Sequence, residues 1–302
     1  MFLKMEKVKD LKNANEELRN VQKAWAEQYL QKYISLCEEE SSAYHKDKGS
    51  KRNGFELSCP FCMGVTQEYI ANKDNKKKIM IVGQQPLGFG CWNDHIEDFY
   101  SEDDKNEWSH IGLQNWAIEY LKTQLGNKTE RGIKYNSSPF WRLFRALKEN
   151  YALCWNDIDK VYYGKKDNDF HEGTLTYEAE RFLSAPFEYK GKKISLVKRE
   201  IEIARPDVVI FATGPSYALS MAIALDYEYP KKPINSIKNI HLRQADPVKE
   251  LDSIKLDDKI IKVLWTYHPG YLTQTKYRGN NLFNEAIGRI KSKLEDLNEN
   301  KS

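Results

Sequence analysis

Two hydrophobic periods alternate along most of the chain. Four short, continuous apolar runs are typical of buried strands, and they occupy residues 79–82, 151–155, 207–212 and 260–265. Segments with apolar residues three or four positions apart are typical of helices that bury one face, and they occupy residues 112–125, 138–148, 195–204 and 284–297. This alternation predicts an α/β fold, a three-layer α/β/α sandwich around a central, mainly parallel four-stranded sheet.

The polar stretches divide the chain into an N-terminal extension and a main domain. Residues 7–40 have helical periodicity and many charges, and a polar segment without periodicity follows them. We therefore expect N-terminal helices with a linker over residues 1–50 and one α/β domain over residues 51–302. Within that domain, residues 165–193 and 226–258 interrupt the alternation and are interpreted as surface insertions.

Composition and charge narrow the function classes. The 302 residues include 47 Lys and Arg and 44 Asp and Glu, so the net charge of +3 is too small for a polybasic protein that packages nucleic acid. Any nucleic acid must therefore meet a local basic patch. The apolar runs are too short for a membrane helix, the N-terminus is charged too early for a signal peptide, and five cysteines do not suit a disulfide scaffold. We expect a cytoplasmic protein with no membrane partner.

Unusual polar residues follow three of the four predicted strands. The first strand leads into residues 83–90, Gly-Gln-Gln-Pro-Leu-Gly-Phe-Gly, the second ends beside Asn156, and the last leads into residues 268–270, His-Pro-Gly. The carboxyl ends of parallel strands meet at one edge of a sheet, and ligands of open α/β folds bind outside that edge. The sequence therefore predicts one site there.

The order of these loops resembles the uracil-DNA glycosylase superfamily. Its members have a G-x-[DN]-P or G-E-x-P-G loop after the first strand, an Asn after a central strand and an H-P-[SAG] loop after the last, and the match spans roughly residues 55–290. Residues 83–91 most resemble the single-strand-selective monofunctional branch, whereas residues 205–207 and 266–269 resemble the iron-sulfur bacterial branch. The resemblance implies a DNA glycosylase that flips uracil or a related damaged base out of single- or double-stranded DNA and hydrolyses its N-glycosidic bond.

His268 and Asn156 carry the chemistry that this resemblance implies. Cleavage leaves negative charge on the departing base, so a donor such as His268 must be aimed at the base oxygen. The amide of Asn156 both donates and accepts, as reading the O4/N3 edge of uracil requires. From the residues alone, two structural interpretations stay open, a hydrogen-bonded His at a strand end and an Asn turn before Asp157.

Gln85 departs from the resembled loop, whose best-known form has an Asp that polarises the attacking water. A Gln amide holds a water but cannot accept its proton at neutral pH. Gln85 is therefore assigned to positioning the water, beside His268 as the second catalytic residue. The missing carboxylate leaves another hypothesis open, a catalytically silent member of the same fold that binds nucleic acid or a nucleotide.

Further loop residues are assigned to the base and to DNA. Gly83 and Gln84 are assigned to the base, and Gly83 lets the backbone come close to it. Phe89 is expected to stack on the base, with Trp92 and Phe99 as competitors. The residues assigned to DNA contacts, including a wedge between bases, are Lys160, Gly270, Tyr271, Leu272 and Arg278. Additional candidates for phosphate contacts are Lys134, Arg142 and Lys276.

Cys59 and Cys62 form a C-x₂-C pair before the first loop, where the iron-sulfur glycosylases also have one. An iron-sulfur cluster or a structural zinc needs four ligands. The other cysteines, at positions 37, 91 and 154, do not form a second pair at the spacing of that family. We therefore expect free thiols and no cofactor, with Cys59 and Cys62 as weak metal candidates.

Overall fold

A five-stranded sheet forms the centre of the protein. The computed structural model describes residues 11–30, 32, 55–84, 95–127, 132–161, 163–165, 184–225, 246–256, 258–274 and 280–299. The strands lie in the order β3 (Tyr151–Asp157), β2 (Lys77–Gly83), β7 (Val208–Phe211), β9 (Lys259–Thr266) and β8 (Val248–Leu256). The first four are parallel, and β8 runs antiparallel to β9. The four predicted strands and their parallel arrangement are confirmed.

The edge strand β8 lies inside a stretch that the sequence analysis interpreted as a surface insertion. Its buried residues are Val248, Leu251 and Ile254, while charged residues between them face solvent. A register shift between Leu251 and Ile254 makes this spacing irregular. A strand with one solvent-exposed face and a shifted register has no continuous apolar run, and the sequence pattern therefore missed it.

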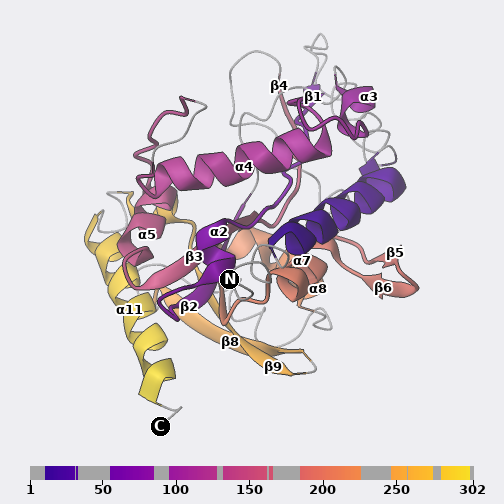
Figure 1. Ribbon diagram of the computed structural model, residues 1–302. Helices are drawn as coiled ribbons and strands as arrows, with labels where there is room; N and C mark the ends of the chain where they lie inside the picture. Colours follow the sequence, from indigo (N-terminus) through magenta and orange to yellow (C-terminus); the bar gives the residue numbers. More distant parts are fainter. Residues whose placement is uncertain are drawn as a thin grey trace, which may run out of the picture.

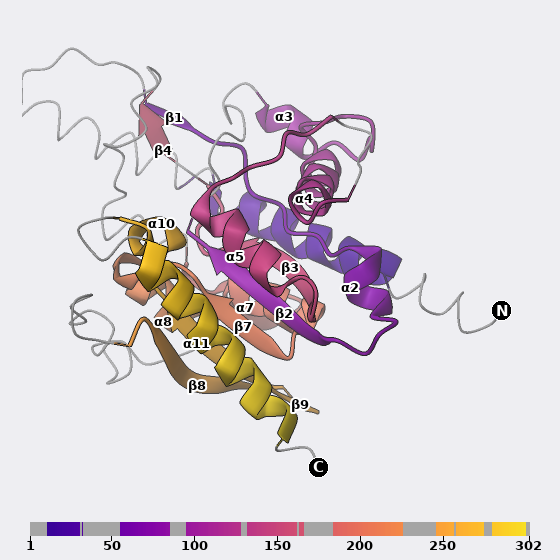
Figure 2. The same ribbon diagram turned by 90° about the vertical axis from the view of Figure 1, so that its left-hand side faces the viewer.

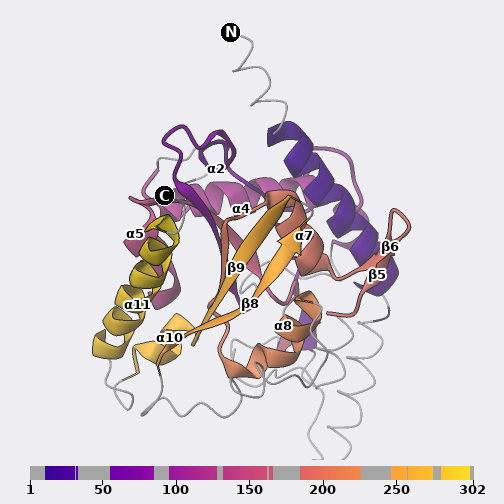
Figure 3. The ribbon, with the colours of Figure 1, turned by 90° about the horizontal axis from the view of Figure 1, so that it is seen from below.

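Helices lie on both faces of the sheet (Figure 3). The helices α5 (Pro139–Leu147) and α11 (Asn280–Glu299) contact each other on one face, and α7 (Leu196–Ala204) and α8 (Ala218–Ala224) contact each other on the opposite face. The long helix α4 (His110–Gln124) precedes α5 (Figure 1). The four helices predicted between and after the strands are confirmed as α4, α5, α7 and α11, and α8 adds a further one.

The connections place a switch point between β2 and β7. From β2 the chain passes through α4 and α5 to β3 on one side of β2, and then through α7 to β7 on the other side. The strand order therefore reverses at β2, and the connecting helices lie on opposite faces because such crossovers are right-handed. A crevice for ligands is expected where the carboxyl ends of β2 and β7 diverge.

A first helix, described over residues 11–30, packs against the domain next to α7 (Figure 1). Leu18, Val21, Trp25 and Leu30 are buried and belong to the same hydrophobic cluster as the central strands. The predicted amphipathic helix is confirmed over these residues. It completes the core of the domain rather than standing apart from it.

The remaining elements are short. β1 (Phe55–Leu57) pairs with β4 (Tyr163–Lys165) beside the main body (Figure 2), and β5 (Phe187–Tyr189) pairs with β6 (Lys192–Ile194) across a turn in which Lys190 and Gly191 have positive φ. The short helices are α2 (Gln67–Ala71), α3 (Ile96–Phe99) and α10 (Pro269–Leu272). No helix in the described part of the chain is long and apolar enough to span a bilayer.

Candidate active site

The carboxyl ends of the parallel strands bring together groups from all four of them. Gln84 follows β2, and its side-chain Nε2 donates to the carbonyl oxygen of Thr213, which follows β7, at 2.7 Å. The backbone carbonyl of Gln84 accepts from the amide of Asp159, beyond β3, at 3.0 Å. Gln84 therefore ties the strand ends together at the switch point. Gln84 was expected at the base, but its side-chain donor is engaged by the carbonyl of Thr213.

Gly83 must be a glycine because two side chains occupy the space beside its Cα. It lies directly opposite Asp157 in the ladder between β2 and β3. A Cβ at this position would collide with Oδ1 of Asp157 and stand 3.0 Å from the ring of Phe140 on α5. The sequence analysis expected the backbone at Gly83 to approach a ligand, and the groups that approach it in this structure are a carboxyl and an aromatic ring.

Asp157 is the residue at this edge that sequence reasoning missed. Its side chain is buried, and its Oδ1 accepts from the indole Nε1–H of Trp155 at 3.0 Å. Within the described residues, its Oδ2 is buried without a hydrogen-bond partner. Burial raises the pKa of the Asp157 carboxyl to about 7, against the opposing effects of Trp155 and the positive charge of Lys160. The sequence signal that could have identified it is a carboxylate at the carboxyl end of a predicted strand, next to Asn156.

His268 follows β9 and caps the short helix α10. Its Nδ1 accepts from the backbone N–H of Gly270 at 3.2 Å, which assigns the proton of the neutral ring to Nε2. Burial lowers the pKa of His268 to about 4, so the ring is neutral at pH 7. The ring of Phe140 lies parallel to it, with 6.1 Å between centroids. His268 is therefore a neutral N–H donor, the form that the expected role requires.

The three residues after Pro269 differ in what they offer to DNA. Gly270 lies under the His268 ring, where an added Cβ would stand 3.1 Å from Nδ1. Tyr271 is 45% exposed, so its side chain is accessible at this edge. Leu272 is 1% exposed and belongs to the hydrophobic core. The expected wedge role is therefore compatible with Tyr271 but not with Leu272, because a core side chain cannot enter a base stack without leaving the core.

Asn156 and Lys160 have partners other than the expected base and phosphate. The amide Nδ2 of Asn156 donates to the Glu200 carboxylate at 3.0 Å, and its Oδ1 accepts from the backbone N–H of Asp157 at 2.8 Å and from Nζ of Lys160. Lys160 Nζ also lies 2.7 Å from the Glu200 carboxylate, which accepts from the side-chain amide of Gln22 at 2.8 Å. These four side chains form one buried polar network.

This buried polar network corrects the two expected roles. Asn156 and Glu200 are 0% exposed and Lys160 is 3% exposed. An amide with both of its groups engaged in the interior is not available to read a base edge, and an ammonium held by Glu200 and Asn156 is not available to a backbone phosphate. The network instead links the end of β3 to α7 and to the first helix, and so stabilises the packing of these elements.

Several expected residues lie outside the described part of the chain. These are Gln85, Phe89, Trp92, Lys276 and Arg278. Phe99, a competitor for stacking on the base, is buried in α3 and is excluded by its burial. Of the candidates for phosphate contacts, Lys134 is exposed, whereas the guanidinium of Arg142 lies 4.6 Å from the ring centre of Phe283.

The described cysteines, Cys59, Cys62 and Cys154, are all buried. Burial raises the pKa of the Cys62 thiol, and the negative charge of Glu200 adds to this effect. Burial also raises the pKa of Cys154 to about 12. Across the residues that the structure describes, no three His, Cys, Asp or Glu side chains gather as a metal site would require. Cys59 and Cys62 are therefore packed as core residues in this structure.

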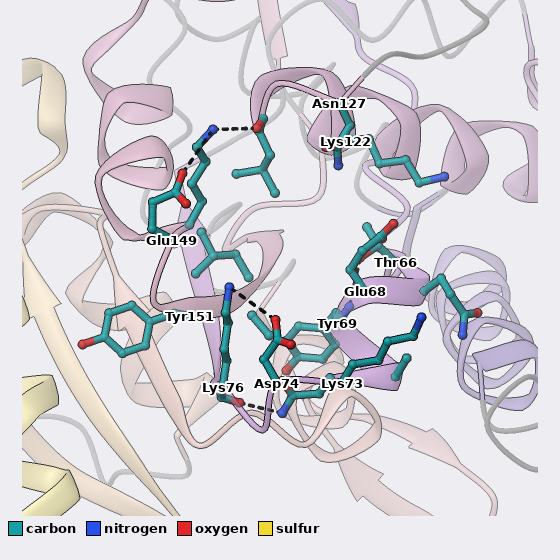
Figure 4. Close-up of a pocket in the computed structure, with 17 residues that line it drawn as sticks. Thr66, Glu68, Tyr69, Lys73, Asp74, Lys76, Lys122, Asn127, Glu149 and Tyr151 are labelled. Carbon is teal, nitrogen blue, oxygen red and sulfur yellow. Dashed lines mark hydrogen bonds and ion pairs between the residues drawn. The ribbon is translucent and has the colours of Figure 1, made fainter. Parts of the chain in front are cut away.

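A separate pocket of about 480 Å³ lies at the opposite, amino-terminal edge of the sheet (Figure 4). It is lined by α2 and the residues after it, by the carboxyl-terminal ends of α4 and α5 with the residues that follow them, and by the first residues of β3. Three of its lysines already have acidic neighbours, Lys76 with Asp74 at 3.8 Å, Lys122 with Glu119 at 2.8 Å and Lys148 with Glu149 at 3.6 Å. Its charges therefore balance locally. Burial raises the pKa of Tyr69, one of its lining residues, well above the ordinary value of a tyrosine.

The chain matches no protein-family model and no curated protein sequence. Its chemistry must therefore be inferred from the strand-end groups themselves. Those groups are the neutral donor His268, the buried carboxyl of Asp157 and the ring of Phe140. This ring lies parallel to the His268 ring and, like the Asp157 carboxyl, borders Gly83.

Proposed function

We propose that this protein is a DNA glycosylase that hydrolyses the N-glycosidic bond of uracil or a related damaged base. The observation that carries the proposal is the state of His268 at the end of β9. Its ring is neutral, oriented by the backbone of Gly270, and presents Nε2–H as a donor. A departing base anion needs such a donor at its developing oxyanion, and a neutral imidazole supplies it without giving up a proton.

The fold supports the same proposal. A mainly parallel sheet between two layers of helices is compatible with the three-layer sandwich of the uracil-DNA glycosylase superfamily, to which we assign the chain by the order of its loops. His268 lies at the strand ends, where open sheets of this type bind ligands. Tyr271, three residues further on, is exposed, and in this proposal it contacts DNA beside the flipped base.

A second candidate function is favoured by the placement of Asn156. Its amide is held by Glu200 and Lys160 in the interior. The side chain that, by the resemblance, would recognise the base edge is therefore not accessible to a ligand. In this second function, the protein binds a base or nucleotide at the strand ends without cleaving it. Affinity without cleavage is the result that would favour this second function.

The decisive experiment incubates the purified protein with single- and double-stranded oligonucleotides that contain one uracil, followed by alkaline scission at abasic sites. The wild type is expected to produce scission. Removing one oxyanion donor costs about two to three orders of magnitude in rate, so His268→Ala should cut slowly. His268→Gln, which retains an N–H donor, should cut faster than His268→Ala, and both variants are checked for an unchanged unfolding transition.

Two results would contradict the proposal. Folded wild-type protein that releases no base from oligonucleotides carrying uracil, hypoxanthine, xanthine or an oxidised pyrimidine would exclude glycosylase activity on these substrates. Equal rates for wild type and His268→Ala would remove the observation on which the proposal rests. In the first case, binding of the same oligonucleotides measured by fluorescence anisotropy decides whether the silent alternative holds.

A further inference from the structure

We propose that Asp157 is the general base of the glycosylase reaction, the carboxylate that accepts a proton from the attacking water. This inference rests on the function proposed above and assigns a residue that the loop comparison does not identify. Gln85, at the position where the best-known form of the resembled loop has an Asp, cannot take a proton at neutral pH. A general base must therefore come from another segment, and the geometry points to the end of β3.

The surroundings of Asp157 leave one oxygen for a ligand. Oδ1 is held by the indole N–H of Trp155 at 3.0 Å, which orients the carboxyl. Oδ2 is buried and has no hydrogen-bond partner among the described residues. A buried, unpartnered carboxyl oxygen is costly to keep for structure alone, because a hydrogen-bond partner would lower that cost. One water bound to Oδ2 would satisfy this oxygen.

Asp157 and the donor His268 have a common neighbour, the ring of Phe140. The absence of a side chain at Gly83 makes room for the carboxyl, and the Phe140 ring borders the same space at 3.0 Å from where a Cβ would stand. His268 is also a neighbour of Phe140, and the two rings lie nearly parallel with 6.1 Å between centroids. Asp157 and His268 therefore both lie near Phe140 at the carboxyl ends of the strands, and we infer that they act as acceptor and donor on one ligand.

The step balances without a cofactor. Oδ2 of Asp157 takes one proton from a water molecule, and the water oxygen forms a bond to C1′ of the deoxyribose. The bond between C1′ and the base nitrogen breaks, and its electron pair leaves with the base. The negative charge that develops on the base oxygen is stabilised by Nε2–H of His268.

The charges around Asp157 support a base that works near neutral pH. The charged groups that act on it are Lys160, in the turn after β3, and Glu200 on α7, and their effects on its pKa oppose each other. Burial is the largest effect and raises the pKa of Asp157 to about 7. A general base is most effective when its pKa lies near the working pH. Glu200 itself is committed to Lys160 and Asn156.

The test measures single-turnover base release by wild type and by Asp157→Asn over pH 5 to 9. The wild-type rate should rise about tenfold per pH unit at low pH and level off near pH 7. Asp157→Asn should lose about two to four orders of magnitude and the rising limb. Asp157→Ala with added formate should regain activity, because formate replaces the missing carboxylate. The control is Asp207→Asn, which changes a carboxylate at the other end of the sheet and should retain the wild-type pH profile.

The outcomes separate this inference from the proposed function. If wild type releases the base and Asp157→Asn releases it at the same rate, the assignment of Asp157 is overturned while the glycosylase function stands. A wild-type rate that falls as pH rises through 7 overturns it as well, because that profile requires a protonated Asp157. If wild type releases no base under any condition, the proposed function fails and the assignment fails with it. Loss in Asp157→Asn together with formate rescue of Asp157→Ala supports both.

Discussion

Removing the cation from the buried Lys160–Glu200 pair should strongly destabilise the protein. The two charged groups are 2.7 Å apart, and their side chains are 3% and 0% exposed. Lys160→Met keeps most of the side-chain volume but leaves the Glu200 carboxylate in the interior. Asn156 and Gln22 still donate to Glu200 in this variant, although neither carries a positive charge.

The expected loss follows from this burial. Breaking a buried ion pair by removing one partner typically costs about 3–5 kcal/mol, because the remaining charge has lost its counter-ion but not its desolvation cost. Typical domains have a free energy of unfolding of only about 5–15 kcal/mol, so the loss is a large share of the total. The double variant Lys160→Met with Glu200→Gln removes both charges and keeps the amide in the network. It should be more stable than Lys160→Met alone by at least about 1.5 kcal/mol.

Urea unfolding followed by tryptophan fluorescence measures these changes. With a slope of about 3 kcal/mol per molar urea, Lys160→Met should lower the midpoint by about 1 M or more. The matched control is the exposed pair of Arg205 and Asp258, whose side chains are 47% and 67% exposed. Asp258→Asn should cost less than about 1 kcal/mol, because water and salt screen an exposed pair.

Two results would refute this reasoning. A loss of less than about 1 kcal/mol for Lys160→Met would show that the Glu200 carboxylate does not need its cation, either because water reaches it or because it takes up a proton. A double variant as unstable as the sum of its two single variants would show that the two charges are not coupled.

Three further predictions concern the strand ends. Burial raises the pKa of Asp157 from 3.8 to about 7, so its ionisation lowers the free energy of unfolding as pH rises through this window. Asp157→Asn should therefore be more stable than wild type at pH 8 by up to about 4 kcal/mol. Urea titrations should show this difference closing towards pH 4. Burial lowers the pKa of His268 from 6.5 to about 4, so its protonation opposes folding as pH falls through that window, and NMR titration should show a neutral ring with the proton on Nε2 at pH 6. Tyr271→Ala should weaken oligonucleotide binding in anisotropy measurements without lowering the unfolding midpoint, whereas Leu272→Ala should cost about 2–5 kcal/mol of stability, and the opposite pattern would exchange their roles.

Much of the framework could be predicted from local patterns. The continuous apolar runs identified the four parallel strands because each is buried on both faces, and the helical periods identified α4, α5, α7 and α11 because each buries one face. The edge strand β8 escaped because its outer face is charged and its register shifts. The position of His268 at the sheet edge followed from the rule that parallel strands end together.

The sequence by itself determined that polar residues stand at the ends of β2, β3 and β9, and only the tertiary structure decided which of them face each other. Successive side chains of a strand point to opposite faces. Asn156 therefore points towards Glu200 on α7, and Asp157 towards Gly83 and Phe140 on the side of α5. The local pattern around two adjacent polar residues is the same for either choice. Tertiary packing resolves it, by placing Glu200 of α7 beside the amide, and Gly83 of β2 and Phe140 of α5 beside the carboxyl.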